Sequence, residues 1–349
     1  MNAETTNRRS FELVAFAMQT IDKYREDRQR KLLEEAETAL SEAVKYDPQY
    51  ALAAFCSGVT KDLIGKPADA IPFFDRLLKH PPPGDGGSRD EIQYNRGVAW
   101  YHQYGHEDLK HAEDDFLEVV TRTRNEGLKM LARTGLAQTY AMWMIPRPAE
   151  KARLRSGEAP DVLKFIEEQR TKCLQQVKLV NNATPTSENT TSDLTRSVTG
   201  TILNAEGMCE MYWADYNVTG NADKKKTLGQ ALKLLTQAEE YLPDDWANTC
   251  DLASAHMRLA DLKRTMGEPY KPEFEQAVSL LESVVHELRP DYGFAYYELG
   301  RVYRIWGKFG EAKDSFNKSL AIPEEYRDVS DKTVIEERER ADRSDLSFP

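Results

Sequence analysis

Three histidines that lie close together in the chain, His102, His106 and His111, come nearest in this sequence to the donor set of a metal site. A metal ion would need their imidazole rings to converge on one point. Gly105 separates His102 from His106, and we expect it to lie at the end of a helix, so the two rings would not share a helical face. We therefore interpret the segment as a surface turn, and predict no metal site and no cofactor.

Motifs for phosphate binding and for covalent catalysis are also incomplete. Gly65 and Lys66 are followed by Pro67, where a phosphate-binding loop carries Ser or Thr after its lysine. The glycines between residues 84 and 87 follow no predicted strand, and no Ser-His-Asp or Cys-His set can be assembled from the spacing. The sequence predicts a protein that is not an enzyme.

Composition narrows the function further. The net charge is -11, from 47 basic and 58 acidic residues, which argues against general nucleic-acid binding because that needs concentrated lysine and arginine. The four cysteines lie far apart without a CxxC pair, as is typical of a reducing compartment. No apolar run approaches the roughly 18 residues that a membrane span needs. We expect a cytoplasmic protein that does not bind membranes.

One three-residue pattern recurs seven times along the chain. It consists of a small residue, a bulky residue four positions later and a second small or apolar residue seven positions after the first. The small first residues are Ala36, Ala70, Ala112, Cys173, Ala231, Ala277 and Ala312. These offsets place the three residues on one stripe of a helix. A proline ends most of the stripes, twelve residues on at Pro48 and Pro82, one residue late at Pro290 and one residue early at Pro323.

Each of these helices should follow a partner helix with a small residue where the two cross. Gly58 and Gly300 stand twelve residues before the small residue of the next stripe, whereas Gly97, Gly135 and Gly207 stand farther away. Glycine inside a helix costs about 1 kcal/mol relative to alanine, so its recurrence there predicts close helix packing. The longer distances predict longer helices or insertions in the middle of the chain.

These residues resemble the tetratricopeptide repeat (TPR) family over about residues 10 to 323, most clearly at Gly300, Ala312 and Phe316. The resemblance implies an all-α, right-handed superhelical solenoid of about seven helix-turn-helix repeats, with irregular middle repeats and a concave surface lined by the first helices. We divide the chain into N-terminal repeats over 1–181, a flexible linker or insertion over 182–193, C-terminal repeats over 194–323, and a charged capping helix or disordered tail over 324–349.

The resemblance also implies a binding groove lined by first-helix side chains. The predicted partner-binding residues are Tyr94, Asn95, Tyr101, Lys129, Arg133, Tyr140, Tyr297, Arg301 and Arg304. Some family members hold the terminal carboxylate of a peptide with two Lys, two Asn and one Arg from three consecutive repeats. Asn95, Lys129 and Arg133 match three of these five positions, whereas Phe55 and Val59 occupy the other two and cannot serve.

The expected function is that of an adaptor or scaffold that binds a peptide or helix of another protein, with a C-terminal carboxylate as one candidate anchor. One alternative is a ligand-sensing regulatory subunit that switches an associated effector, with residues 181–193 as its hinge. Another is a self-assembling structural protein, suggested by the aromatic residues of the last repeat. Whether the loops at 146–160 and 181–193 have a function stays open at this point.

Overall fold

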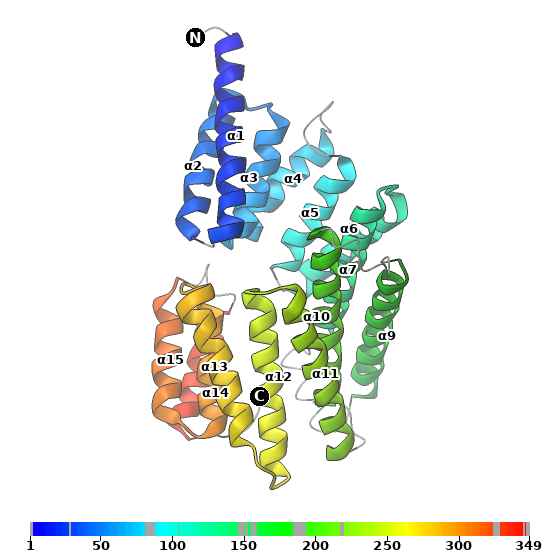
Figure 1. Ribbon diagram of the computed structural model, residues 1–349, viewed down its shortest axis with the longest axis vertical. Coiled ribbons are helices and arrows are strands. Elements are labelled where there is room, and N and C mark those ends of the chain that lie inside the picture. Colours follow the sequence, from blue (N-terminus) through cyan, green and yellow to red (C-terminus); the bar gives the residue numbers. More distant parts are fainter. Residues whose placement is uncertain are drawn as a thin grey trace. The chain divides into compact units, whose positions relative to one another are not determined.

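A computed structural model describes residues 3–27, 29–80, 88–103, 105–145, 150, 153–154, 159–183, 193–216, 220–323, 329–344 and 346. All its regular elements in these ranges are helices, which confirms the predicted all-α class (Figure 1). The chain divides into two compact units, Met1–Leu136 and Ala137–Pro349. The division falls inside one helix, Glu126–Trp143. Most of the predicted linker over 182–193 lies outside the described residues, so its predicted role stays a prediction.

The N-terminal unit consists of helices that pair in order along the chain (Figure 1). Its helices are α1 (Ala3–Asp27), α2 (Arg30–Tyr46), α3 (Ala51–Ile64), α4 (Pro67–Lys79), α5 (Arg89–Tyr101), α6 (His106–Arg122) and the first part of α7 (Glu126–Trp143). Helix α1 packs on α2, α3 on α4 and α5 on α6, and helices α2 and α4 also contact the first helix that follows each of them.

The C-terminal unit continues the same arrangement with longer helices at its start. It contains the rest of α7, then α9 (Pro160–Ala183), α10 (Asp193–Tyr216), α11 (Asn221–Tyr241), α12 (Trp246–Thr265), α13 (Lys271–Ser283), the π-helical turn η1 (Val284–Leu288), α14 (Gly293–Trp306), α15 (Phe309–Ala321) and α16 (Asp331–Asp342). Helices α9, α10 and α11 have 24, 24 and 21 residues, which confirms the predicted irregular middle repeats.

The seven sequence stripes coincide with the seven second helices, α2, α4, α6, α9, α11, α13 and α15. The small residue that begins each stripe is fully buried in every case.

The late position of Pro290 after its stripe has a structural cause. The π-helical turn after α13 takes one residue more than an α-helical turn, and Arg289 N donates to Val284 O across it at 2.7 Å. Pro290 therefore follows one position later than its equivalents.

Close packing at the mid-helix glycines is confirmed by the bulky residues that fill the space above them. A Cβ atom at Gly300 would lie 2.5 Å from the Phe316 ring, and one at Gly58 would lie 2.7 Å from the Phe74 ring. In both pairs the aromatic residue is the second member of the stripe on the following helix. Small residues on first helices thus let the bulky stripe residues approach the backbone, as the repeat pattern predicts.

Helix α16 covers the end of the last repeat. It packs against α15 and α14, and its Val334 and Ala341 are fully buried. Ser330 begins the helix as an N-cap, because its hydroxyl accepts a hydrogen bond from Thr333 N. A solenoid end needs such a polar-faced terminal helix, since its last apolar surface has no further repeat to cover it.

Candidate functional site

The structure brings the predicted clamp residues to two first helices that share a neighbour. Asn95 lies on α5, and Lys129 and Arg133 lie on α7. Cβ atoms at Gly97 of α5 and Gly135 of α7 would lie 2.9 Å and 2.7 Å from the ring of Phe116 on α6. Both first helices therefore run past the same aromatic ring of α6.

Asn95 and Lys129 make contacts within their own helices. Asn95 Nδ2 donates to Glu91 O at 2.8 Å, and Lys129 Nζ pairs with Glu126 at 2.6 Å on an exposed part of the helix. Lys129 and Arg133 stand one helical turn apart, so they share a face of α7.

The predicted aromatic lining of the groove takes part mainly in packing. The Tyr94 ring lies 5.7 Å from that of Phe116, and burial raises the pKa of Tyr94 to about 12. Tyr140 is 3% exposed, with the Lys172 ammonium 5.2 Å above its ring. Tyr101 is half-buried at the end of α5. The sequence pattern identified the helices that carry these tyrosines but not the direction in which each ring points.

The predicted residues of the last repeat are buried. Tyr297 packs against Phe316, Arg301 Nη1 donates to Glu298 at 2.6 Å, and Arg304 Nε donates to Glu337 of α16 at 2.9 Å. The prediction took these side chains for surface residues. The structure encloses them because α16 covers this end of the repeat. Their role in partner binding stays a prediction.

The histidine segment contains separate contacts. His102 Nδ1 lies 2.9 Å from Asp62 of α3, whereas the His111 ring packs against Trp100 in a tilted arrangement with 4.6 Å between the ring centroids. Within the part of the chain that the structure describes, no group of three or more His, Cys, Asp or Glu residues could hold a metal ion. In the same part, none of the helices is both long and apolar enough to span a membrane.

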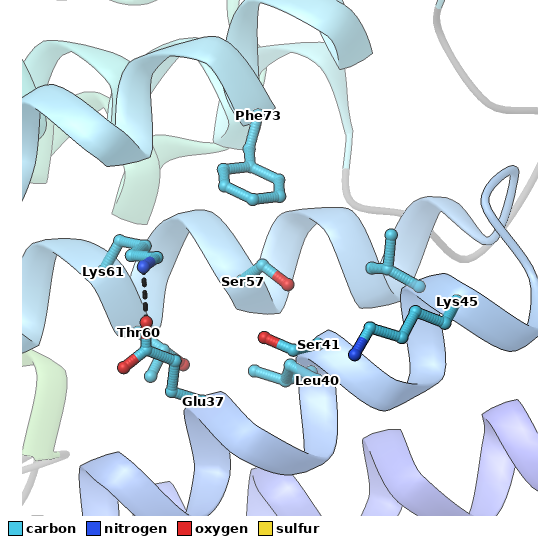
Figure 2. Close-up of a pocket in the computed structure, with 9 residues that line it drawn as sticks. Glu37, Leu40, Ser41, Lys45, Ser57, Thr60, Lys61 and Phe73 are labelled. Atoms are coloured by element: carbon cyan, nitrogen blue, oxygen red, sulfur yellow. Dashed lines mark hydrogen bonds and ion pairs between the residues drawn. The ribbon is translucent and has the colours of Figure 1, made fainter.

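A pocket of about 260 Å³ opens between α2, α3 and α4 of the N-terminal unit (Figure 2). Leu40 and Val44 of α2 and Phe73 of α4 supply its apolar lining. Figure 2 shows the Phe73 ring pointing toward Ser57 on the α3 side. The pocket combines two second helices, α2 and α4, with the first helix α3, and none of its lining residues belongs to α5 or α7.

Polar groups lie at the two ends of this pocket. At one end Lys61 Nζ pairs with Glu37, and the neighbouring Thr60 is fully buried. The Thr60 hydroxyl has no hydrogen-bond partner among the described residues. At the other end the exposed Lys45 extends toward Ser41 (Figure 2). Lys45 forms no ion pair with any residue in the described ranges.

First helices of the C-terminal unit carry a second polar cluster. Asn204 Nδ2 of α10 donates to Asn248 Oδ1 at 3.1 Å and to Asp251 Oδ2 at 2.9 Å, both on α12. Burial raises the pKa of Asp251 to about 7, and the nearby carboxylates of Asp245 and Glu298 act in the same direction. These contacts join α10 to α12 through hydrogen bonds as well as through apolar packing.

Sequence reasoning did not identify the pocket or the Asp251 cluster. Thr60 and Lys45 belong to different helices, and their relation depends on how α2 and α3 pack. Nothing in the spacing of one helix reveals that a threonine hydroxyl lacks a partner. One signal was available: Asn204 lies in the middle of a first helix, and asparagine is rare in a buried position without a hydrogen-bond partner.

Comparisons with known proteins agree with this architecture. Residues 295–326 match the tetratricopeptide repeat family. A tetratricopeptide repeat protein from Parabacteroides merdae is similar in structure, with 14% sequence identity, coverage of 96% of this chain and 99% of that chain, and a TM-score of 0.50. The TPR protein TTC0263 of Thermus thermophilus is 17% identical, with 74% and 100% of the two chains covered and a TM-score of 0.45. No curated protein matches the sequence.

Proposed function

Residues 295–326 match the tetratricopeptide repeat family and the chain has the fold of such a protein, so we propose that it is a scaffold that binds an extended segment of another protein. The supporting observation is that α5 and α7 both pass the ring of Phe116. Two successive first helices are thus close enough for one peptide to contact both.

The carboxylate of a peptide C-terminus is the proposed anchor. Lys129 and Arg133 share a face of α7 and can both donate charge-assisted hydrogen bonds to one carboxylate. Such a ligand would displace Glu126 from Lys129. This exchange costs little, because an exposed ion pair contributes only about 0–1 kcal/mol. Asn95 on α5 would contact the peptide backbone beside the terminus.

A random octapeptide pool, prepared with free and with amidated C-termini, tests this proposal. We expect binding of the free-acid pool only, with a loss of about 10- to 100-fold in Lys129→Glu and Arg133→Glu, since a hydrogen bond to a charged group contributes about 1.5–3 kcal/mol. Lys31→Glu on α2 is the matched control, because Lys31 is also a lysine paired with a glutamate on its own helix. Equal binding of both pools by all variants would reject the carboxylate anchor.

The regulatory alternative places a hinge at residues 181–193. Most of this segment lies outside the described residues, so no observation favours that alternative over the scaffold.

A further inference from the structure

We propose that the pocket between α2, α3 and α4 is a second peptide-binding site, which takes a tyrosine side chain of the partner together with a carboxylate next to that tyrosine. This inference rests on the proposed function, since it assumes that the partner is a protein. It concerns different helices from the α5 and α7 surface, so the two can be tested separately.

The apolar part of the pocket matches one aromatic side chain. Leu40, Val44 and Phe73 line a volume of about 260 Å³. Sites for whole small molecules usually have about 300–1,000 Å³, so a single side chain is the better match. An aromatic ring that enters beside Phe73 would also gain an aromatic contact, which is favourable beyond the area that the ring buries.

The Thr60 hydroxyl indicates that the side chain has a polar end. Ser57, one turn earlier on α3, is satisfied because its hydroxyl donates to Ala53 O at 2.7 Å. Thr60 makes no such bond and is fully buried against the pocket. An unsatisfied buried hydroxyl is unfavourable, and a ligand that supplies a partner removes that cost. The phenol of tyrosine can both donate and accept, so it suits this position.

Charge at the opposite end indicates the neighbouring carboxylate. Of the two lysines that line the pocket, Lys61 is neutralised by Glu37, whereas Lys45 has no carboxylate partner among the described residues. Glu37 and Lys45 stand eight residues apart on α2, about 12 Å along its axis. A tyrosine that reaches Thr60 with its hydroxyl would leave the adjacent residue of its chain near Lys45. An aspartate or glutamate there completes the match.

The test uses the full-length protein and the tetrapeptide acetyl-Gly-Tyr-Asp-Gly-amide, with binding measured by NMR titration. Versions with Phe for Tyr and with Asn for Asp remove the phenol and the carboxylate. We expect each change to weaken binding about five- to tenfold, as the loss of one hydrogen bond or ion pair does. The free acid 3-(4-hydroxyphenyl)propionate carries the same chemistry without a peptide and should bind more weakly than the tetrapeptide.

Two protein variants assign the contacts. Thr60→Val keeps the side-chain shape and should weaken the tyrosine peptide to the level of its Phe version without affecting that version. Lys45→Gln removes the charge and should weaken binding of the Asp peptide to the level of its Asn version, whereas Lys31→Gln on the same helix should leave all affinities unchanged. Circular dichroism melting checks that each variant is folded.

Several results would overturn the inference: no saturable binding of the tetrapeptide, equal affinity for all peptide versions, losses that are independent of Thr60 and Lys45, or tighter binding of the free acid than of the tetrapeptide. Lys129→Glu should not change binding of the amidated tetrapeptide. If the tetrapeptide does not bind as expected while Lys129→Glu still weakens binding of the free-acid octapeptides, the pocket is rejected as a peptide site. The scaffold proposal then still stands.

Discussion

Two helical glycines with opposite surroundings show how packing decides the effect of a single methyl group. Gly300 of α14 lies against Phe316, so a Cβ atom would approach the ring to 2.5 Å, whereas Gly229 of α11 has no atom within 4 Å of that position. Alanine gains about 1 kcal/mol over glycine through helix propensity at both sites. At Gly300 this gain is opposed by the cost of overpacking a filled core.

We predict that Gly300→Ala lowers the free energy of unfolding by up to about 2 kcal/mol, the overpacking cost less the propensity gain, and that Gly229→Ala raises it by up to about 1 kcal/mol. Urea denaturation of both variants measures the two changes. Stabilisation by both substitutions would show that the close approach of α14 and α15 does not exist in solution.

Asp251 predicts a pH dependence of stability. Burial raises its folded pKa to about 7, from an ordinary value of 3.8. Below about pH 4 the carboxyl is protonated in both states and has no effect. Between about pH 4 and about pH 7 the unfolded chain loses the proton while the folded chain keeps it, so stability falls as the pH rises. Above about pH 7 the folded state remains destabilised by on the order of 4 kcal/mol, since one pKa unit corresponds to about 1.4 kcal/mol.

We therefore expect Asp251→Asn to stabilise the protein at about pH 8 and to have little effect at about pH 4, because an asparagine side chain cannot ionise but can still accept from Asn204. Thermal melting at acidic, neutral and mildly basic pH measures the difference. Asp314→Asn on α15, whose side chain makes no hydrogen bond to a neighbouring helix among the described contacts, is the control and should follow the wild-type profile. A difference between Asp251→Asn and wild type that is constant over this range would contradict the assigned burial.

At the scale of elements, α16 is tied to the last repeat by a buried ion pair. Arg304 of α14 and Glu337 of α16 have side chains that are 0% and 7% exposed. Removing one partner of such a pair leaves a charge inside the protein and costs about 3–5 kcal/mol, whereas replacing both by apolar residues restores much of the loss.

Glu337→Leu should accordingly destabilise the protein by about 3–5 kcal/mol, and the double variant Arg304→Met/Glu337→Leu should recover most of that stability. Glu336→Gln, at an exposed neighbouring position, should change it by less than about 1 kcal/mol. Chemical denaturation gives all three values. A Glu337→Leu protein as stable as Glu336→Gln would mean that α16 does not dock on α14.

Element by element, the sequence predicted the helices far better than their contacts. The second helices were recognisable because burial requires a small residue at one position and a bulky residue one turn later, as at Ala312 and Phe316. The tail was harder, because its charges do not reveal that Glu337 faces inward to meet Arg304. The pocket was inaccessible for a related reason: the position of Thr60 between α2 and α4 follows from packing and not from any pattern within α3.

At the scale of the whole molecule, each repeat contacts mainly its neighbours within its unit. A scaffold of this kind separates stability from binding. Charge reversal on an exposed part of α7 can remove a partner without unfolding the chain, because the packing stripes are untouched. The central claim is therefore that a partner protein depends on Lys129 and Arg133.

Affinity capture from the native host tests this claim most directly, with the retained proteins identified by mass spectrometry. The proteins used for capture are the wild type, the double variant Lys129→Glu/Arg133→Glu and the control Lys31→Glu. Circular dichroism should show the same helicity for all three. We predict at least one protein that wild type and Lys31→Glu retain and the double variant loses. An identical set of proteins on all three would contradict the claim.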